Sequence, residues 1–314
     1  MWLIVAAALA VAALALILVP YERDLRAARE HVSHGSEIAQ TRCGPIEYAI
    51  VGSGRPVLLV HGAGGGFDQG LDIAAGLAKD GLRIILMSRF GYLRTPLPSD
   101  ASAAAQADAH ACLLDTLQIE RAAILGASAG APSALQFALR HPTRCDALVL
   151  LVPAAFVARP GNAAPLRIPP GTQLLFETAL RSDFLFWSVI RLAHDLVLRA
   201  VLATPPEVVR KASAAEQARV AKMMTDVLPV SRRRLGLLND AAVMSTLARY
   251  ELERIAAPTL AISAADDLFG TYEVARNIAE QIPGARFVGY PTGGHLWAGH
   301  HDEVLREIAG FLRR

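Results

Sequence analysis

Short apolar segments alternate with helical patterns along most of the chain. The apolar segments are rich in Val, Ile and Leu, as buried parallel strands are; they are Pro56–Val60, Leu82–Met87, Ala122–Leu125, Leu148–Val152, Pro258–Ser263 and Arg286–Tyr290. Amphipathic helix patterns lie between them, near residues 68–80, 101–118, 129–140, 271–282 and 302–313. This alternation predicts an α/β fold: a mainly parallel, doubly wound sheet with helices on both faces. Residues 41–52 are expected to add an antiparallel hairpin.

One region interrupts the alternation. Residues 154–255 contain no convincing strand; a Pro/Gly-rich stretch at 159–171 precedes helical patterns at 173–202, 206–228 and 231–248. We expect an all-helical insertion at 154–255 that divides the core into residues 41–153 and 256–314. The consecutive arginines 232–234 either bind an acidic group or form a solvated helix face.

The N-terminus is strongly apolar. Trp2 to Val19 are eighteen consecutive apolar residues, which as a helix span about 27 Å, close to a hydrocarbon core of about 30 Å. We predict a transmembrane anchor at residues 1–20 and a polar stalk at 21–40. A cleaved signal peptide is the alternative, but no basic residue precedes the apolar run and no small-residue cleavage site follows it. Arg23, Arg26 and Arg29 follow the run, which places the remaining chain on the cytoplasmic side.

Composition excludes several classes of protein. The net charge of +2 gives no reason to expect a nucleic-acid partner. Most of the 31 basic residues are arginine, which with abundant alanine is typical of a GC-rich bacterial genome. The three cysteines (Cys43, Cys112 and Cys145) are widely spaced, so no zinc or other metal site and no redox motif is expected, and free thiols suit a reducing compartment.

A serine stands at a sharp predicted turn. Gly126-Ala127-Ser128-Ala129-Gly130 is a G-x-S-x-G sequence that follows a strand and precedes a helix. In this context the serine lies on a strained turn with its Oγ exposed, and the helix start supplies backbone N–H groups beside it. Ser128 is therefore the candidate nucleophile.

A serine hydroxyl needs a base to become a good nucleophile. His295 follows Gly293 and Gly294 in a loop between the last strand and the last helix. Asp266 and Asp267 directly follow the strand Pro258–Ser263, and one of them is expected to orient the imidazole. We predict Asp266 in this role, with Asp267 as the alternative.

The chain order Ser, Asp, His resembles that of the α/β-hydrolase superfamily over roughly residues 41–314. The segment His61–Gly66 looks like the superfamily's oxyanion loop. The resemblance implies that the backbone N–H groups of Ala63 and Ala129 bind the oxyanion, with Gly64 as the alternative to Ala63, and that His61 braces the loop. The next loop, Ser88–Thr95, lacks the Asp and the second Gly of the pattern D-x-x-G-x-G-x-S that many members carry.

The resemblance also implies an activity. A serine at the elbow implies acyl transfer, so we expect a serine hydrolase that cleaves an apolar acyl substrate, most simply a carboxylic ester, without a cofactor. The alternative is a non-catalytic, membrane-tethered ligand-binding module on the same fold. The helical insertion resembles the cap of these enzymes, and its aromatic residues either line the acyl pocket or form the cap's own core; they are Phe176, Phe184, Phe186 and Trp187.

Overall fold

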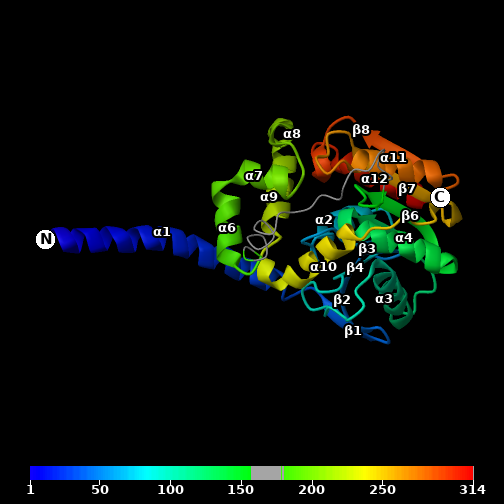
Figure 1. Ribbon diagram of the computed structural model, residues 1–314, viewed down its shortest axis with the longest axis horizontal. Coiled ribbons are helices and arrows are strands. Elements are labelled where there is room, and N and C mark those ends of the chain that lie inside the picture. Colours follow the sequence, from blue (N-terminus) through cyan, green and yellow to red (C-terminus); the bar gives the residue numbers. More distant parts are fainter. Residues whose placement is uncertain (157–177, 179, 314) are drawn as a thin grey trace.

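The computed structural model of the chain describes residues 1–156, 178 and 180–313 and is built on one eight-stranded sheet (Figure 1). The strands are β1 (Glu37–Thr41), β2 (Gly44–Val51), β3 (Arg55–Val60), β4 (Leu82–Met87), β5 (Ala122–Ala127), β6 (Cys145–Leu151), β7 (Thr259–Ala264) and β8 (Arg286–Tyr290). Their order is β1-β2-β4-β3-β5-β6-β7-β8. The first two strands are antiparallel to their neighbours and the others pair in parallel. The predicted fold class is confirmed. The expected hairpin is present, but it begins at Glu37, so its first strand lies within the segment predicted as the stalk.

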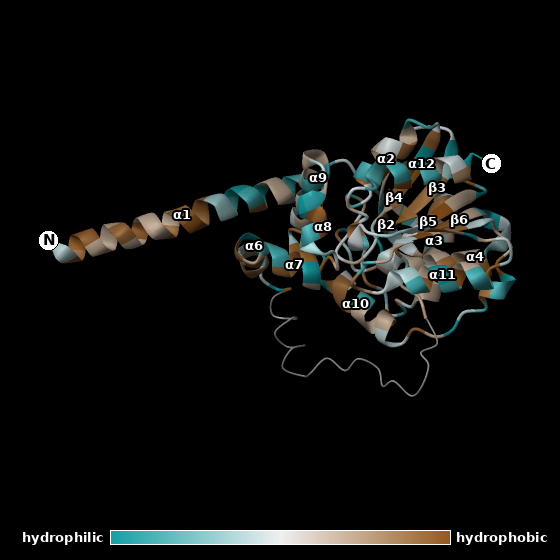
Figure 2. Ribbon diagram, turned by 90° about the horizontal axis from the view of Figure 1, so that it is seen from above, coloured by the Kyte–Doolittle hydropathy of each residue, from teal (hydrophilic) through white to brown (hydrophobic). Residues whose placement is uncertain are grey.

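Helices cover both faces of this sheet (Figure 2). Helices α2 (Leu71–Ala78) and α12 (His301–Leu312) lie on one face; α3 (Ala103–Thr116), α4 (Ala131–Arg140) and α11 (Thr271–Gln281) lie on the other. Successive side chains of a strand point to opposite faces. In β3, Val57 and Leu59 therefore pack into the first layer, and Leu58 and Val60 into the second. This central strand is buried on both sides, which explains why its sequence is a continuous apolar run.

The described part of the chain between β6 and β7 contains helices and no strand. These helices are α6 (Asp183–Leu192), α7 (His194–Ala200), α8 (Pro206–Lys211), α9 (Ala214–Thr225) and α10 (Arg234–Ser245). We call them the cap. Phe176 and the Pro/Gly-rich stretch 159–171 lie outside the described residues.

Two buried ion pairs join the cap to the core. Arg233, at the start of α10, is fully buried and pairs with Asp68, with 2.7 Å between Nη2 and Oδ2. Asp240, in α10, forms a bidentate pair with Arg89 after β4, at 2.6 and 2.7 Å. Arg233 therefore neither lies on a solvated helix face nor is free to bind an acidic group of a ligand, and both predictions are wrong for this residue. Its buried guanidinium clamps the cap to the core.

The N-terminal helix α1 (Trp2–His31) continues through Pro20 without a break. Its first part projects from the body, and its side chains are exposed (Figure 1). By length and composition this helix could cross a membrane. Its second part, expected as a solvated stalk, is helical and partly packed: the Leu25 side chain is buried, and so is that of Val32 just after the helix.

The cysteines differ from the expectation of free thiols. A disulfide joins Cys43, in the turn between β1 and β2, to Cys112 of α3, with their Cα atoms 6.0 Å apart. The sequence did not reveal this pair because 69 residues separate its members and only folding brings α3 beside the hairpin. Cys145 is free and buried, and burial raises the pKa of its thiol to about 12.

Candidate active site

Ser128 occupies a sharp turn between β5 and α4. Its φ angle is +48°, a left-handed conformation that is costly for any residue other than glycine. The glycines on either side are required by close contacts. A Cβ atom at Gly130 would lie 2.4 Å from the carbonyl oxygen of Val60, and one at Gly126 would lie 2.6 Å from Cβ of Ala134. The G-x-S-x-G sequence therefore lets the strand turn sharply into the helix against β3.

His295 lies beside Ser128. The distance from Nε2 of His295 to Oγ of Ser128 is 2.9 Å, within hydrogen-bond range. The histidine follows β8 in a loop where Gly293 has a φ of +136° and Gly294 a φ of +62°. This loop is also fixed by the cap, because the His295 N–H donates to the carbonyl oxygen of Ala203.

The carboxylate that faces His295 belongs to Asp267. Its Oδ2 lies 2.7 Å from Nδ1 of the imidazole, and the side chain is fully buried. The same carboxylate accepts hydrogen bonds from the backbone N–H of Phe269 and the hydroxyl of Thr271, which hold it in place.

The prediction of Asp266 as this partner is therefore wrong. Its Oδ1 accepts a hydrogen bond from the Gly294 N–H at 2.7 Å, so Asp266 braces the histidine loop without reaching the imidazole. Sequence could not separate the two residues, because the turn after β7 decides which adjacent side chain points inward. Thr271 lies four residues after Asp267, and in the structure its buried hydroxyl donates to the Asp267 carboxylate. A hydroxyl residue at this spacing is a nearby feature of the sequence that favours Asp267.

The predicted oxyanion donors line the same cavity as Ser128 and His295. Ala63 and Ala129 are both on its wall. The N–H of Gly64, the alternative donor, is directed elsewhere: it donates to the Tyr92 hydroxyl oxygen at 3.2 Å. This geometry favours Ala63 over Gly64.

His61 is a structural part of this loop. Its Nε2 accepts a hydrogen bond from the Arg89 backbone N–H at 3.0 Å, which leaves Nδ1 to donate to the Gly62 carbonyl oxygen at 2.7 Å. Burial, reinforced by the nearby Arg89 guanidinium, holds the pKa of His61 well below its ordinary value. His61 is therefore a neutral brace with both ring nitrogens engaged.

The cavity over Ser128 has a volume of about 750 Å³. Its wall is mainly apolar, with α10 contributing Leu237, Ala241 and Met244. The described lining residues include no Lys or Arg. The three described aromatic residues that were considered for this wall lie elsewhere: Phe184 and Trp187 contact Tyr21 of α1, and Phe186 packs inside the cap.

The sequence did not reveal the polar network behind the cavity. The Tyr92 hydroxyl donates to Oδ2 of Asp240 at 2.6 Å and accepts from Gly64. Burial, together with the Asp240 carboxylate, raises the pKa of Tyr92 well above 10, so the phenol stays protonated. The loop Ser88–Thr95, which departs from the superfamily pattern, thus uses Arg89 and Tyr92 to tie the cap to the oxyanion loop.

Comparison with known proteins agrees with this fold. The family model described as "alpha/beta hydrolase fold" matches residues 55–298, most of the chain. The chain belongs to the α/β-hydrolase fold family. A solved α/β-hydrolase fold protein from Nakamurella multipartita is 32% identical with a TM-score of 0.69; the match covers 88% of this chain and 99% of that one.

Two curated hydrolases are also similar over most of their length. An uncharacterized hydrolase of Bacillus subtilis, YcgS, is 27% identical over 86% of this chain and 95% of its own. A 2-hydroxy-6-oxononadienedioate/2-hydroxy-6-oxononatrienedioate hydrolase of Comamonas testosteroni is 26% identical over 83% and 88%. The predicted superfamily is confirmed, and the chain is a hydrolase of this family.

Proposed function

We propose that this α/β-hydrolase is a serine hydrolase that cleaves an apolar acyl substrate, most simply a carboxylic ester. The observation that carries the proposal is the continuous hydrogen-bonded chain from Ser128 Oγ through the His295 imidazole to the Asp267 carboxylate. An elbow serine, an imidazole and a buried carboxylate in this order are the parts that nucleophilic acyl transfer requires.

Each group has one role in the proposed cycle. His295 Nε2 accepts the Ser128 proton as Oγ attacks the substrate carbonyl carbon. The N–H groups of Ala63 and Ala129 stabilise the oxyanion that develops. His295 then protonates the leaving group, and a water deprotonated by the same imidazole releases the acid and restores Ser128. Asp267 holds the proton on Nδ1 and stabilises the imidazolium.

The cavity supports an apolar, uncharged acyl group. Its wall is mainly aliphatic. Of its described acidic residues, Asp240 is already paired with Arg89, and Glu273 would repel an anion. The Comamonas testosteroni relative is named for a dioate, a doubly carboxylated substrate. Without a Lys or Arg among the described lining residues, a dicarboxylate is a poor match here.

We also propose that α1 is retained and tethers the enzyme to a membrane. Its exposed apolar segment, from Trp2 to Val19, supports this proposal. Two features point to opposite sides of that membrane. Arg23, Arg26 and Arg29 favour the cytoplasm, whereas a disulfide between Cys43 and Cys112 favours an oxidising compartment. Protease protection of sealed vesicles distinguishes these two orientations, because only an outward-facing hydrolase body is degraded.

The test of the hydrolase proposal is the turnover of p-nitrophenyl esters from acetate to long acyl chains. The full chain in detergent is compared with Ser128→Ala and with Ser245→Ala, which removes an exposed hydroxyl at the end of α10. We expect activity to fall by orders of magnitude in Ser128→Ala alone. Equal activity in all three proteins, together with no labelling of Ser128 by a fluorophosphonate, would instead favour a non-catalytic binding module.

A further inference from the structure

Helices α6 and α7 carry a row of exposed aliphatic side chains. Leu185, Val189 and Leu192 are spaced i, i+4 and i+7 and so share one side of α6. Leu196 of α7 and Val201 just after α7 are exposed as well. Leu192 is 87% exposed and Leu196 is 60% exposed. We call these five residues the aliphatic row. Grouped exposed apolar side chains mark an interaction surface.

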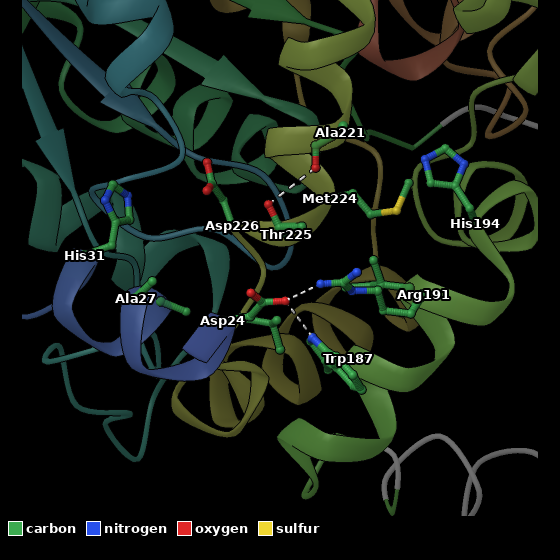
Figure 3. Close-up of a pocket in the computed structure, with 13 residues that line it drawn as sticks. Asp24, Ala27, His31, Trp187, Arg191, His194, Ala221, Met224, Thr225 and Asp226 are labelled. Atoms are coloured by element: carbon green, nitrogen blue, oxygen red, sulfur yellow. Dashed lines mark hydrogen bonds and ion pairs between the residues drawn. The ribbon is translucent and has the colours of Figure 1, made fainter. Parts of the chain in front are cut away.

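The helix that carries most of this row is fixed against α1. The Tyr21 ring lies 5.1 Å from the Phe184 ring and 5.5 Å from the Trp187 ring, centroid to centroid. The Asp24 carboxylate accepts hydrogen bonds from Trp187 Nε1 at 3.0 Å and from Arg191 Nη2 at 2.6 Å (Figure 3). These contacts come from both ends of a short segment of α1, so they set the position and the direction of α6 relative to α1.

Tyr21 follows the apolar run of α1 almost directly. It lies two residues beyond Val19, or about 3 Å along the helix axis. The aromatic cluster of Tyr21, Phe184 and Trp187 is thus placed where a spanning helix leaves the hydrocarbon region, and Tyr and Trp are enriched at that boundary. Helices α6 and α7 lie on the side of the body from which α1 projects (Figures 1 and 2).

We propose that the aliphatic row is a second membrane contact and inserts into the boundary between lipid headgroups and acyl chains. This inference rests on the proposed tether and goes beyond it, because it assigns the cap to the bilayer surface. Arg191 and Arg199 on the same two helices are paired with Asp24 and Glu207, so the contact with lipid rests on the aliphatic side chains. The occupant is lipid, because the contacts with α1 hold α6 next to the point where the apolar run ends.

The test measures the depth of single spin labels in the full chain reconstituted into lipid nanodiscs. Labels are attached to Leu192→Cys and Leu196→Cys, to Leu9→Cys in the apolar run, and to Ile50→Cys, an exposed aliphatic position on β2. The unsubstituted chain measures background labelling of buried Cys145. Collisions with oxygen, which concentrates in lipid, are compared with collisions with a water-soluble nickel chelate.

We expect the oxygen-to-nickel collision ratio at positions 192 and 196 to exceed that at position 50 several-fold, with the highest ratio at position 9. A high ratio at position 9 with equal ratios at 192 and 50 would overturn the inference and leave the tether intact. A ratio at position 9 as low as that at 50 would overturn both. Low collision rates with both reagents at 192 would mean that protein, such as a second copy, covers the row, and would also overturn the inference.

Discussion

Exchanging Asp267 for Asn changes one atom of the proposed active site. It reverses the hydrogen bond to His295, and the Thr271 hydroxyl, which donates to the same Oδ2, must then accept instead. The carboxylate Oδ2 now lies 2.7 Å from Nδ1 of His295, which it keeps protonated. An amide nitrogen at that position would donate to Nδ1 and move the imidazole proton to Nε2. Because Nε2 faces the Ser128 hydroxyl at 2.9 Å, the imidazole could then no longer accept the serine proton.

The expected loss is large because the tautomer is inverted while the packing is unchanged. Inverting the tautomer in a triad of this kind costs about 10⁴ in kcat, which corresponds to about 5.5 kcal/mol of transition-state stabilisation. Asp266→Asn is the matched control. An Asn at position 266 retains a carbonyl oxygen that can accept the Gly294 N–H bond, so we expect less than about a tenfold loss, equivalent to one modest hydrogen bond.

The assay is the rate at which a fluorophosphonate labels Ser128, followed by p-nitrophenyl ester turnover for the variants that label. The labelling rate needs no knowledge of the natural substrate. Near-wild-type labelling of Asp267→Asn, or a greater loss in Asp266→Asn, would refute the assignment of Asp267 as the orienting carboxylate.

Three further predictions follow from buried groups. Burial lowers the pKa of His61 and lowers that of His110 to about 3, so below pH 6.5 the unfolded chain binds protons that the folded chain does not. As the pH is lowered below 6.5, the free energy of unfolding is therefore expected to decrease by about 1.4 kcal/mol per pH unit for each histidine. Urea denaturation measures this slope, which is expected to be smaller in His110→Gln. Asp240→Ala leaves a buried arginine without its partner and is expected to cost about 3–5 kcal/mol of unfolding free energy, whereas Asp195→Ala at an exposed pair is expected to leave the unfolding free energy nearly unchanged. Gly130→Ala places a Cβ atom 2.6 Å from the His61 carbonyl oxygen, so we expect the elbow to shift and fluorophosphonate labelling to slow even where circular dichroism is unchanged.

Sequence patterns located the core well because each pattern has a local physical cause. The predicted strands agree with the structure to within a few residues; Leu82–Met87 and Arg286–Tyr290 agree at both ends. A strand buried on both faces must be apolar throughout, and the surrounding Gly, Pro and charged residues end it. The same local logic identified Ser128, because an elbow requires small residues on both sides.

Relations between distant segments were not predictable in this way. The choice of Asp267 depends on side-chain direction after β7, and the burial of Arg233 depends on Asp68, which is 165 residues away in sequence. A run of arginines read alone looks like a solvated surface. Only the packing of α10 over the oxyanion loop makes one of them internal.

The two cap clamps also hold the oxyanion loop itself. Besides its carboxylate partner, Arg233 donates to the Gly65 carbonyl oxygen at 2.6 Å, and Arg89 donates to that of Gly62 at 3.1 Å. Lifting the cap therefore removes the Arg233 bond to the loop that carries Ala63 and leaves Arg89 without its Asp240 partner. Turnover and cap docking would then be lost together, at a temperature below the melting of the sheet. Heat inactivation would therefore report on the two ion pairs between cap and core, while circular dichroism would still show a folded protein.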